Sequence, residues 1–246
     1  MNINEALARK VLEVVDAGLV EGVGVPEPGK MCIEAAVNYA MGDPHGDQPK
    51  CVAPSLRRLK IRLNDSSWSS PDARAKGLRR LGIAQLGSAG ALDEVEFAKR
   101  VATLAIGTCV PQALRSAASI CKDETRKANL IAHAEKCESE PTEANARSAK
   151  NAADAADAAA YAAAADAAAY ATAAYADAYA AADYAAYAAV YAATAADYAA
   201  YAAVYAATAA TAARDKSLAD FAEGVVQILI NMGAPGCEWL FLTEAA

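Results

Sequence analysis

Apolar residues recur every three to four positions along most of this chain, which is the spacing of amphipathic helices. Between residues 4 and 17, for example, Leu7, Val11 and Val15 share one helical face. The chain lacks segments that alternate apolar and polar residues, as a half-buried strand does. The pattern therefore predicts an all-α protein built as a helical bundle.

Start and stop signals divide the first 140 residues into helices. The predicted helices cover residues 4–17, 32–41, 72–86, 92–119 and 123–137, with a short basic helix that begins at Pro54. Gly18 is a stop signal, and Ser70 followed by Pro71 is a typical helix start. Within 92–119, Gly107 and Pro111 predict an interruption or a kink.

A tract rich in Ala and Tyr follows. Of the 63 residues from 151 to 213, 40 are Ala, ten are Tyr and six are Asp. The 14 residues 183–196 recur without change as 197–210, which is typical of a scaffold that tolerates changes in length. Because residues 142–223 contain no Gly or Pro and Ala has the highest helix propensity, we expect a long helical repeat region.

The tyrosines of the second half of the tract follow the spacing of a heptad seam. They are Tyr184, Tyr187, Tyr191, Tyr198, Tyr201 and Tyr205. The register changes between Tyr179 and Tyr184, where we expect a bend, a stutter or a turn back. Such a stripe packs within the chain or binds a partner. Spaced Thr residues in an Ala-rich helix are also typical of ice binding, although the tyrosines would interrupt a flat face.

Composition divides the chain into two parts: an N-terminal helical domain over 1–140, and over 141–246 the repeat region with a C-terminal helix that packs on the body. The net charge is −7, of which the tract carries −6, and a helix without cations cannot neutralise nucleic-acid phosphates. We therefore expect no general nucleic-acid binding. Six cysteines without CxxC spacing, no secretory signal and no strongly apolar run of membrane-spanning length favour the cytoplasm.

One group of residues has the elements of a chemical site. Cys32 is predicted at a helix N-terminus, which lowers a thiol's pKa, and Lys30 would add to that effect. His45 could then act as a base oriented by Asp47, in a small cysteine-dependent enzyme. The same residues with Cys51 could hold a metal, although the spacing matches no strong zinc pattern. The alternative is a buried Cys32 and a His45 that caps a turn, and the pattern leans toward a protein without catalysis, metal or cofactor.

A second candidate is the basic region between residues 55 and 80. Its cations are Arg57, Arg58, Lys60, Arg62, Arg74, Lys76, Arg79 and Arg80. This region could bind a phosphate, a nucleotide, a nucleic acid or an acidic protein surface. Alternatively, its cations pair with the acidic tract of the same chain. No phosphate-binding loop, dinucleotide fingerprint or zinc finger is present.

Three stretches carry a resemblance to known proteins: KMCIEAAVNYAMG at residues 30–42, the AAYAA units of the tract, and RDKSLADFAEGVVQILI at 214–230. The chain resembles the Ala-rich proteins assigned as immunity proteins in bacterial toxin–immunity loci, and phage or prophage proteins with Ala-Tyr repeats. The resemblance implies a helical bundle that binds and neutralises a protein. We therefore expect a non-enzymatic interaction module that binds a protein partner or associates with itself through the tyrosine seam.

Overall fold

The computed structural model describes residues 3–121, 123–155 and 210–244. Within these ranges the chain is helical and forms no strand beyond one isolated bridge between Gly24 and Met31. The helices are α1 (Glu5–Asp16), α2 (Ile33–Met41), α3 (Pro54–Asn64), α4 (Pro71–Ala84), α5 (Glu94–Ile120), α6 (Glu124–Ser139), α7 (Glu143–Ala155), α10 (Ala210–Asn231) and the 3-10 helix η1 (Pro235–Thr243). The predicted all-α helical bundle is confirmed.

Side-chain caps fix where the helices begin. Asn4 Oδ1 accepts a hydrogen bond from the Leu7 amide at 3.0 Å and begins α1, and Ser70 Oγ accepts from the Ala73 amide at 3.0 Å and begins α4. Gly42 ends α2 with a φ of 76°, a left-handed conformation that glycine adopts without a steric cost. The start signal read from the sequence at Ser70 therefore acts as expected, and α2 ends at Met41, as the predicted helix over 32–41 does.

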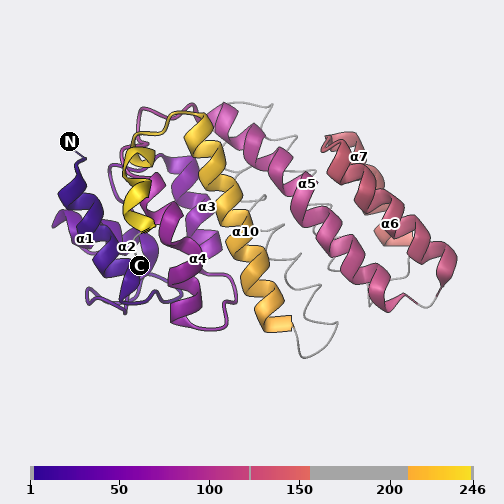
Figure 1. Cartoon of the computed structure of the whole chain (residues 1–246), viewed down its shortest axis with the longest axis horizontal. Coiled ribbons are helices and arrows are strands. Elements are labelled where there is room, and N and C mark those ends of the chain that lie inside the picture. Colours follow the sequence, from indigo (N-terminus) through magenta and orange to yellow (C-terminus); the bar gives the residue numbers. More distant parts are fainter. Residues whose placement is uncertain (1–2, 122, 156–209, 245–246) are drawn as a thin grey trace.

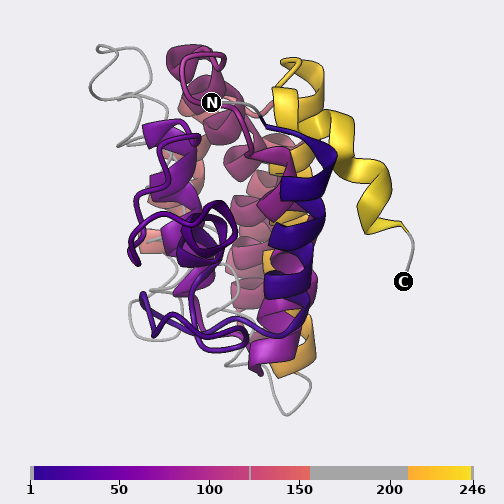
Figure 2. The same ribbon diagram turned by 90° about the vertical axis from the view of Figure 1, so that its left-hand side faces the viewer.

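Helix α5 joins the two sides of the molecule. Figure 1 shows α1 to α4 on one side, α6 and α7 on the other, and α10 lying between α4 and α5. The view in Figure 2 shows η1 beside α1 at the outer surface of the first group. The described part of the chain contains no helix that is both long and apolar enough to cross a membrane.

The interruption expected within residues 92–119 is not seen, because α5 continues through Pro111 as one helix of 27 residues. Proline removes one backbone hydrogen bond, so other contacts must hold the helix together. The flanking residues Ile106, Val110 and Leu114 are fully buried, and α6 and α10 both pack against α5. Tertiary packing therefore outweighs the local cost of the proline.

Trp68 belongs to the core and not to the basic surface. Its indole Nε1 donates a hydrogen bond to the Leu63 carbonyl at 2.8 Å, and only 8% of the residue is exposed. Gly77 in α4 provides the space for the ring, because a Cβ there would lie 2.4 Å from two of its atoms. The serine-rich segment around Trp68 thus fixes the connection between α3 and α4.

Candidate functional site

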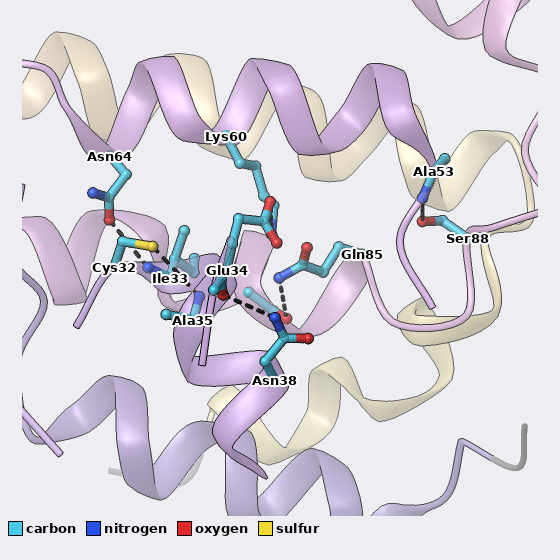
Figure 3. Close-up of polar contacts among 12 residues, drawn as sticks. Cys32, Ile33, Glu34, Ala35, Asn38, Ala53, Lys60, Asn64, Gln85 and Ser88 are labelled. Carbon is cyan, nitrogen blue, oxygen red and sulfur yellow. Dashed lines mark hydrogen bonds and ion pairs between the residues drawn. The ribbon is translucent and has the colours of Figure 1, made fainter. Parts of the chain in front are cut away.

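Two opposite charges lie together inside the helical body. Glu34 of α2 and Lys60 of α3 are both fully buried, with Lys60 Nζ 3.0 Å from Glu34 Oε1. Figure 3 shows the two side chains reaching toward each other between their helices. Neither Lys60 Nζ nor the Glu34 oxygens have a hydrogen-bond partner, so the contact is an ion pair.

The local sequence explains why the lysine is buried. Lys60 lies in the apolar stripe of α3, one position after Leu59 and three before Leu63, both of which are fully buried. Glu34 follows Ile33 within a similar apolar run of α2. Burying an ion pair is costly unless each charge is compensated, so a charge at an apolar helical position is informative. This pair was not predicted from the sequence, although a charged residue within an apolar helical run at both positions indicated it.

Two buried amides near the pair, Asn38 and Gln85, donate through their nitrogens and leave their oxygens without hydrogen bonds. Asn38 Nδ2 donates to the Gly46 carbonyl at 2.8 Å, and Gln85 Nε2 donates to the Gly82 carbonyl at 3.2 Å. Figure 3 shows the Gln85 amide beside the Glu34 carboxylate and Asn38 further along α2. Asn38 Oδ1, Gln85 Oε1 and both Glu34 oxygens lack hydrogen bonds. Buried polar atoms are normally hydrogen-bonded, so this acceptor-rich cluster stands out from the rest of the core.

Burial dominates the ionisation of the pair. It raises the pKa of Glu34 from 4.5 to about 7, while Lys60 and Arg57 act in the opposite direction and Asp47 adds to the rise. Burial likewise lowers the pKa of Lys60, against the opposing effect of Glu34. Desolvation therefore favours the neutral form of each partner.

Cys32 begins α2 as its N-cap, with the Ala35 amide 3.4 Å from Sγ. Burial raises the pKa of this thiol, and the amides of Ala35 and Glu34 offset only part of the rise. Lys30 points away to an ion pair with Glu27 at 2.8 Å. The amides at the helix terminus lower the pKa of Cys32, as predicted, but burial has a larger effect. The net result is a raised pKa.

The other members of the predicted chemical site do not form a cysteine–histidine pair: His45 and Asp47 line the same surface hollow, and no hydrogen bond joins His45 to Cys32. His45 is exposed, and its Nε2 lies 3.0 Å from the Gly24 carbonyl, which ties the loop 43–49 to the bridge at Gly24. Asp47 and Cys51 both act electrostatically on Glu34 or Lys60. The structure therefore groups Cys32, Asp47 and Cys51 around the buried ion pair and not around His45. Among the described residues, no three His, Cys, Asp or Glu side chains are arranged to hold a metal ion.

Several cations of the basic region form ion pairs with acidic residues of the same chain. Arg79 pairs with Asp16 of α1 at 2.7 Å, and Arg80 pairs with Glu223 of α10 at 2.9 Å. Both arginines also bind Thr243 of η1. These acidic partners lie outside the Ala/Tyr tract. By contrast, Arg58 is exposed and Arg57 half-buried.

The tyrosine seam lies outside the described residues. This holds for Tyr184, Tyr187, Tyr191, Tyr198, Tyr201 and Tyr205, and for the register change at 179–184. The structure does describe the two helices that flank the tract, α7 before it and α10 after it. Comparisons with protein-family models, with curated proteins and with solved structures found no match.

Proposed function

We propose that this chain is a non-enzymatic protein-interaction module in which a folded helical body holds an Ala/Tyr-rich binding segment. The proposal extends to a cytoplasmic immunity or phage–host conflict protein that binds and neutralises a partner protein. Self-association through the tyrosines is the alternative form of the same function.

One observation carries the proposal: both helices that flank the tract pack on the same helix of the body. Helix α7 contacts α5 and α6, and α10 contacts α5 and α4. The body thus fixes both ends of residues 156–209, which contain ten of the eleven tyrosines of the chain. Tyrosine is enriched among the residues that dominate binding energy at protein interfaces.

The internal pairing of the basic region supports the same assignment. Arg79 and Arg80 are engaged with Asp16, Glu223 and Thr243, and Lys60 is fully buried. A surface that binds phosphates needs cations that are free to approach them. The tract is therefore a better source of contact residues than α4.

The test compares two double variants as baits. Tyr191→Ala with Tyr198→Ala keeps helix propensity high and removes two rings from the proposed seam. Arg58→Glu with Arg62→Glu is the matched control, since both arginines are exposed and have no ion pair among the described residues. Each bait is used to capture proteins from a bacterial cytoplasmic extract, and each captured protein is then purified and titrated by calorimetry.

We expect the tyrosine variant to bind a purified partner, or itself, at least tenfold more weakly than the unmodified chain. Truncating a buried aromatic costs about 3–5 kcal/mol, whereas an exposed ion pair contributes about 0–1 kcal/mol. The arginine variant should bind nearly normally, with little dependence on salt. If the tyrosine changes are silent and the arginine changes abolish binding, the basic region is the functional surface.

A further inference from the structure

A small cavity of about 50 Å³ adjoins the buried ion pair. Its lining includes the acidic residues Glu34, Asp47 and Asp65 together with Asn64 and Cys32, and it includes no Lys, Arg or His. The cavity is large enough for a group slightly larger than one water, which takes up about 30 Å³ in the liquid. Its lining therefore has an excess of negative charge.

Two of the three carboxylates lack hydrogen-bonding partners. Asp65 Oδ1 accepts from the Gly22 amide at 2.8 Å and from Asn64 Nδ2 at 2.9 Å. Glu34 is fully buried, Lys60 Nζ lies 3.0 Å from its Oε1, and its Oε2 has no hydrogen bond. Asp47 makes no hydrogen bond or ion pair with any described residue, and it acts on Glu34 as a like charge. Both Glu34 and Asp47 would gain from a donor placed between them.

A wider hollow of about 380 Å³ lies beside this cavity, over the loop that contains residues 43–50. Asp47 lines both spaces, so both lie within reach of this one side chain. The hollow is also lined by Asn38, whose buried Oδ1 has no partner, and by the charged residues Asp43 and Lys50. A ligand with a small head in the cavity and its remaining atoms in the hollow would pass beside Asp47.

We propose that these two spaces bind a small primary alkylamine, whose ammonium group donates hydrogen bonds to Glu34 and Asp47. An ammonium has three N–H donors and a single charge, which suits two underbonded carboxylates. A divalent cation instead takes six or more oxygen ligands, and the described residues do not gather such a set. This site is separate from the proposed partner-binding segment and does not depend on it.

The proposal is tested with n-butylammonium, titrated at pH 8 and followed by calorimetry and by NMR shifts of the amides in 32–50. Tetramethylammonium has the same charge but no N–H donor, and 1-butanol has the same chain but no charge. We expect saturable one-to-one binding of butylammonium, at least tenfold tighter than either comparator, with the largest shifts near Asp47.

Two variants locate the site. Asp47→Asn replaces a carboxylate by a neutral amide at a half-buried loop position and should weaken binding at least tenfold. Asp43→Asn is the matched control, because this aspartate lines only the outer hollow, and it should change affinity less than threefold. Glu34→Gln combined with Lys60→Met removes the buried negative charge without leaving a buried lysine unpaired, and this variant should lose saturable binding while it keeps a helical circular dichroism spectrum.

Several results would overturn the amine site. They are equal binding of all three compounds, no saturable binding up to the millimolar range, saturation by Mg²⁺ or Ca²⁺ but not by the amine, or an Asp47→Asn variant that binds as well as the unmodified protein. If the double variant fails to fold, the contrast between Asp47→Asn and Asp43→Asn decides alone.

Discussion

At the scale of single residues, the Glu34–Lys60 pair places two opposite charges in the fully buried interior of the body. Both charges are removed from water, and their mutual attraction must offset the loss of two hydration shells. The contact lacks a well-directed hydrogen bond, and both Glu34 oxygens are otherwise unpartnered. We therefore expect the pair to favour a particular arrangement of α2 and α3 more than it favours stability.

This expectation gives a prediction for replacing one partner or both. Lys60→Met alone should lower the free energy of unfolding by about 3–5 kcal/mol, because it leaves a buried Glu34 uncompensated. Glu34→Leu combined with Lys60→Met should be neutral or stabilising by about 1–4 kcal/mol, because apolar packing replaces the ion pair. Urea unfolding of the three proteins measures both effects. A double variant less stable than the single one would contradict this account.

The same pair predicts a dependence of stability on pH. Burial raises the pKa of Glu34 from 4.5 to about 7, so the folded protein holds this proton more tightly than the unfolded chain does. This contribution to stability is complete below pH 4.5 and is lost as the pH rises through about 7. It is on the order of 3 kcal/mol, at 1.36 kcal/mol for each pKa unit.

We expect the unfolding free energy to fall between pH 5 and pH 8. The control is Glu34→Leu with Lys60→Met, in which this part of the fall should disappear. The lowered pKa of Lys60 has the opposite sign, since its contribution is present above pH 10.5 and is lost as the pH falls, so it does not produce the decrease. Urea titrations at pH 5, 6, 7 and 8 make the comparison, and an equal fall in both proteins would rule out Glu34 as the cause.

At the scale of helices, close packing is decided by small residues. Gly77 and Gly107 both lie inside helices, but only Gly77 faces an aromatic ring, that of Trp68. A Cβ at Gly77 would lie 2.4 Å from that ring, whereas a Cβ at Gly107 would make an ordinary contact with Pro141 at 3.4 Å. The two glycines therefore form a natural pair for comparison.

Gly77→Ala should lower the melting temperature, because the clash with Trp68 outweighs the gain of about 1 kcal/mol in helix propensity. Gly107→Ala should raise it slightly, because there the gain in helix propensity is not opposed. Thermal unfolding followed by circular dichroism measures both changes. Equal stabilisation by the two substitutions would mean that Trp68 can move aside at little cost.

The helices themselves were predictable from the sequence because caps and glycine stops act locally. Asn4, Ser70 and Gly42 show this, since each acts within four residues of its own position. Pro111 is the counterexample, because packing of α6 and α10 around α5 holds the helix through it.

The candidate site was less predictable. Cys32 and Asp47 were singled out, but their neighbour Lys60 comes from another helix, and local patterns do not specify which helices meet.

At the scale of the whole molecule, the body and the tract are connected at two points. Because α7 and α10 both pack on α5, the body can remain folded while the length between them changes. Deleting residues 183–196 removes one of the two identical 14-residue copies, equivalent to about 21 Å of helix. We expect the melting temperature of the body to change by less than about 2 °C.

The control for this deletion removes 14 residues of the body, 94–107 of α5, which should abolish cooperative unfolding. Differential scanning calorimetry measures all three proteins. A large drop in melting temperature on deletion of 183–196 would mean that the tract is part of the core, and a packing seam within the chain would then replace partner binding as its role.

The burial of the cysteines also determines how the protein responds to an oxidant. All six are free, and five of them are buried, so the folded state shields these thiols from reagents. Unfolding would expose them together, and in an oxidising medium they could join in non-native combinations before the helices reform. Folding and unfolding should then be reversible only where a reductant is present. The native packing thus protects the five buried thiols from oxidation. If the chain unfolds in an oxidising medium, non-native disulfides would prevent it from refolding.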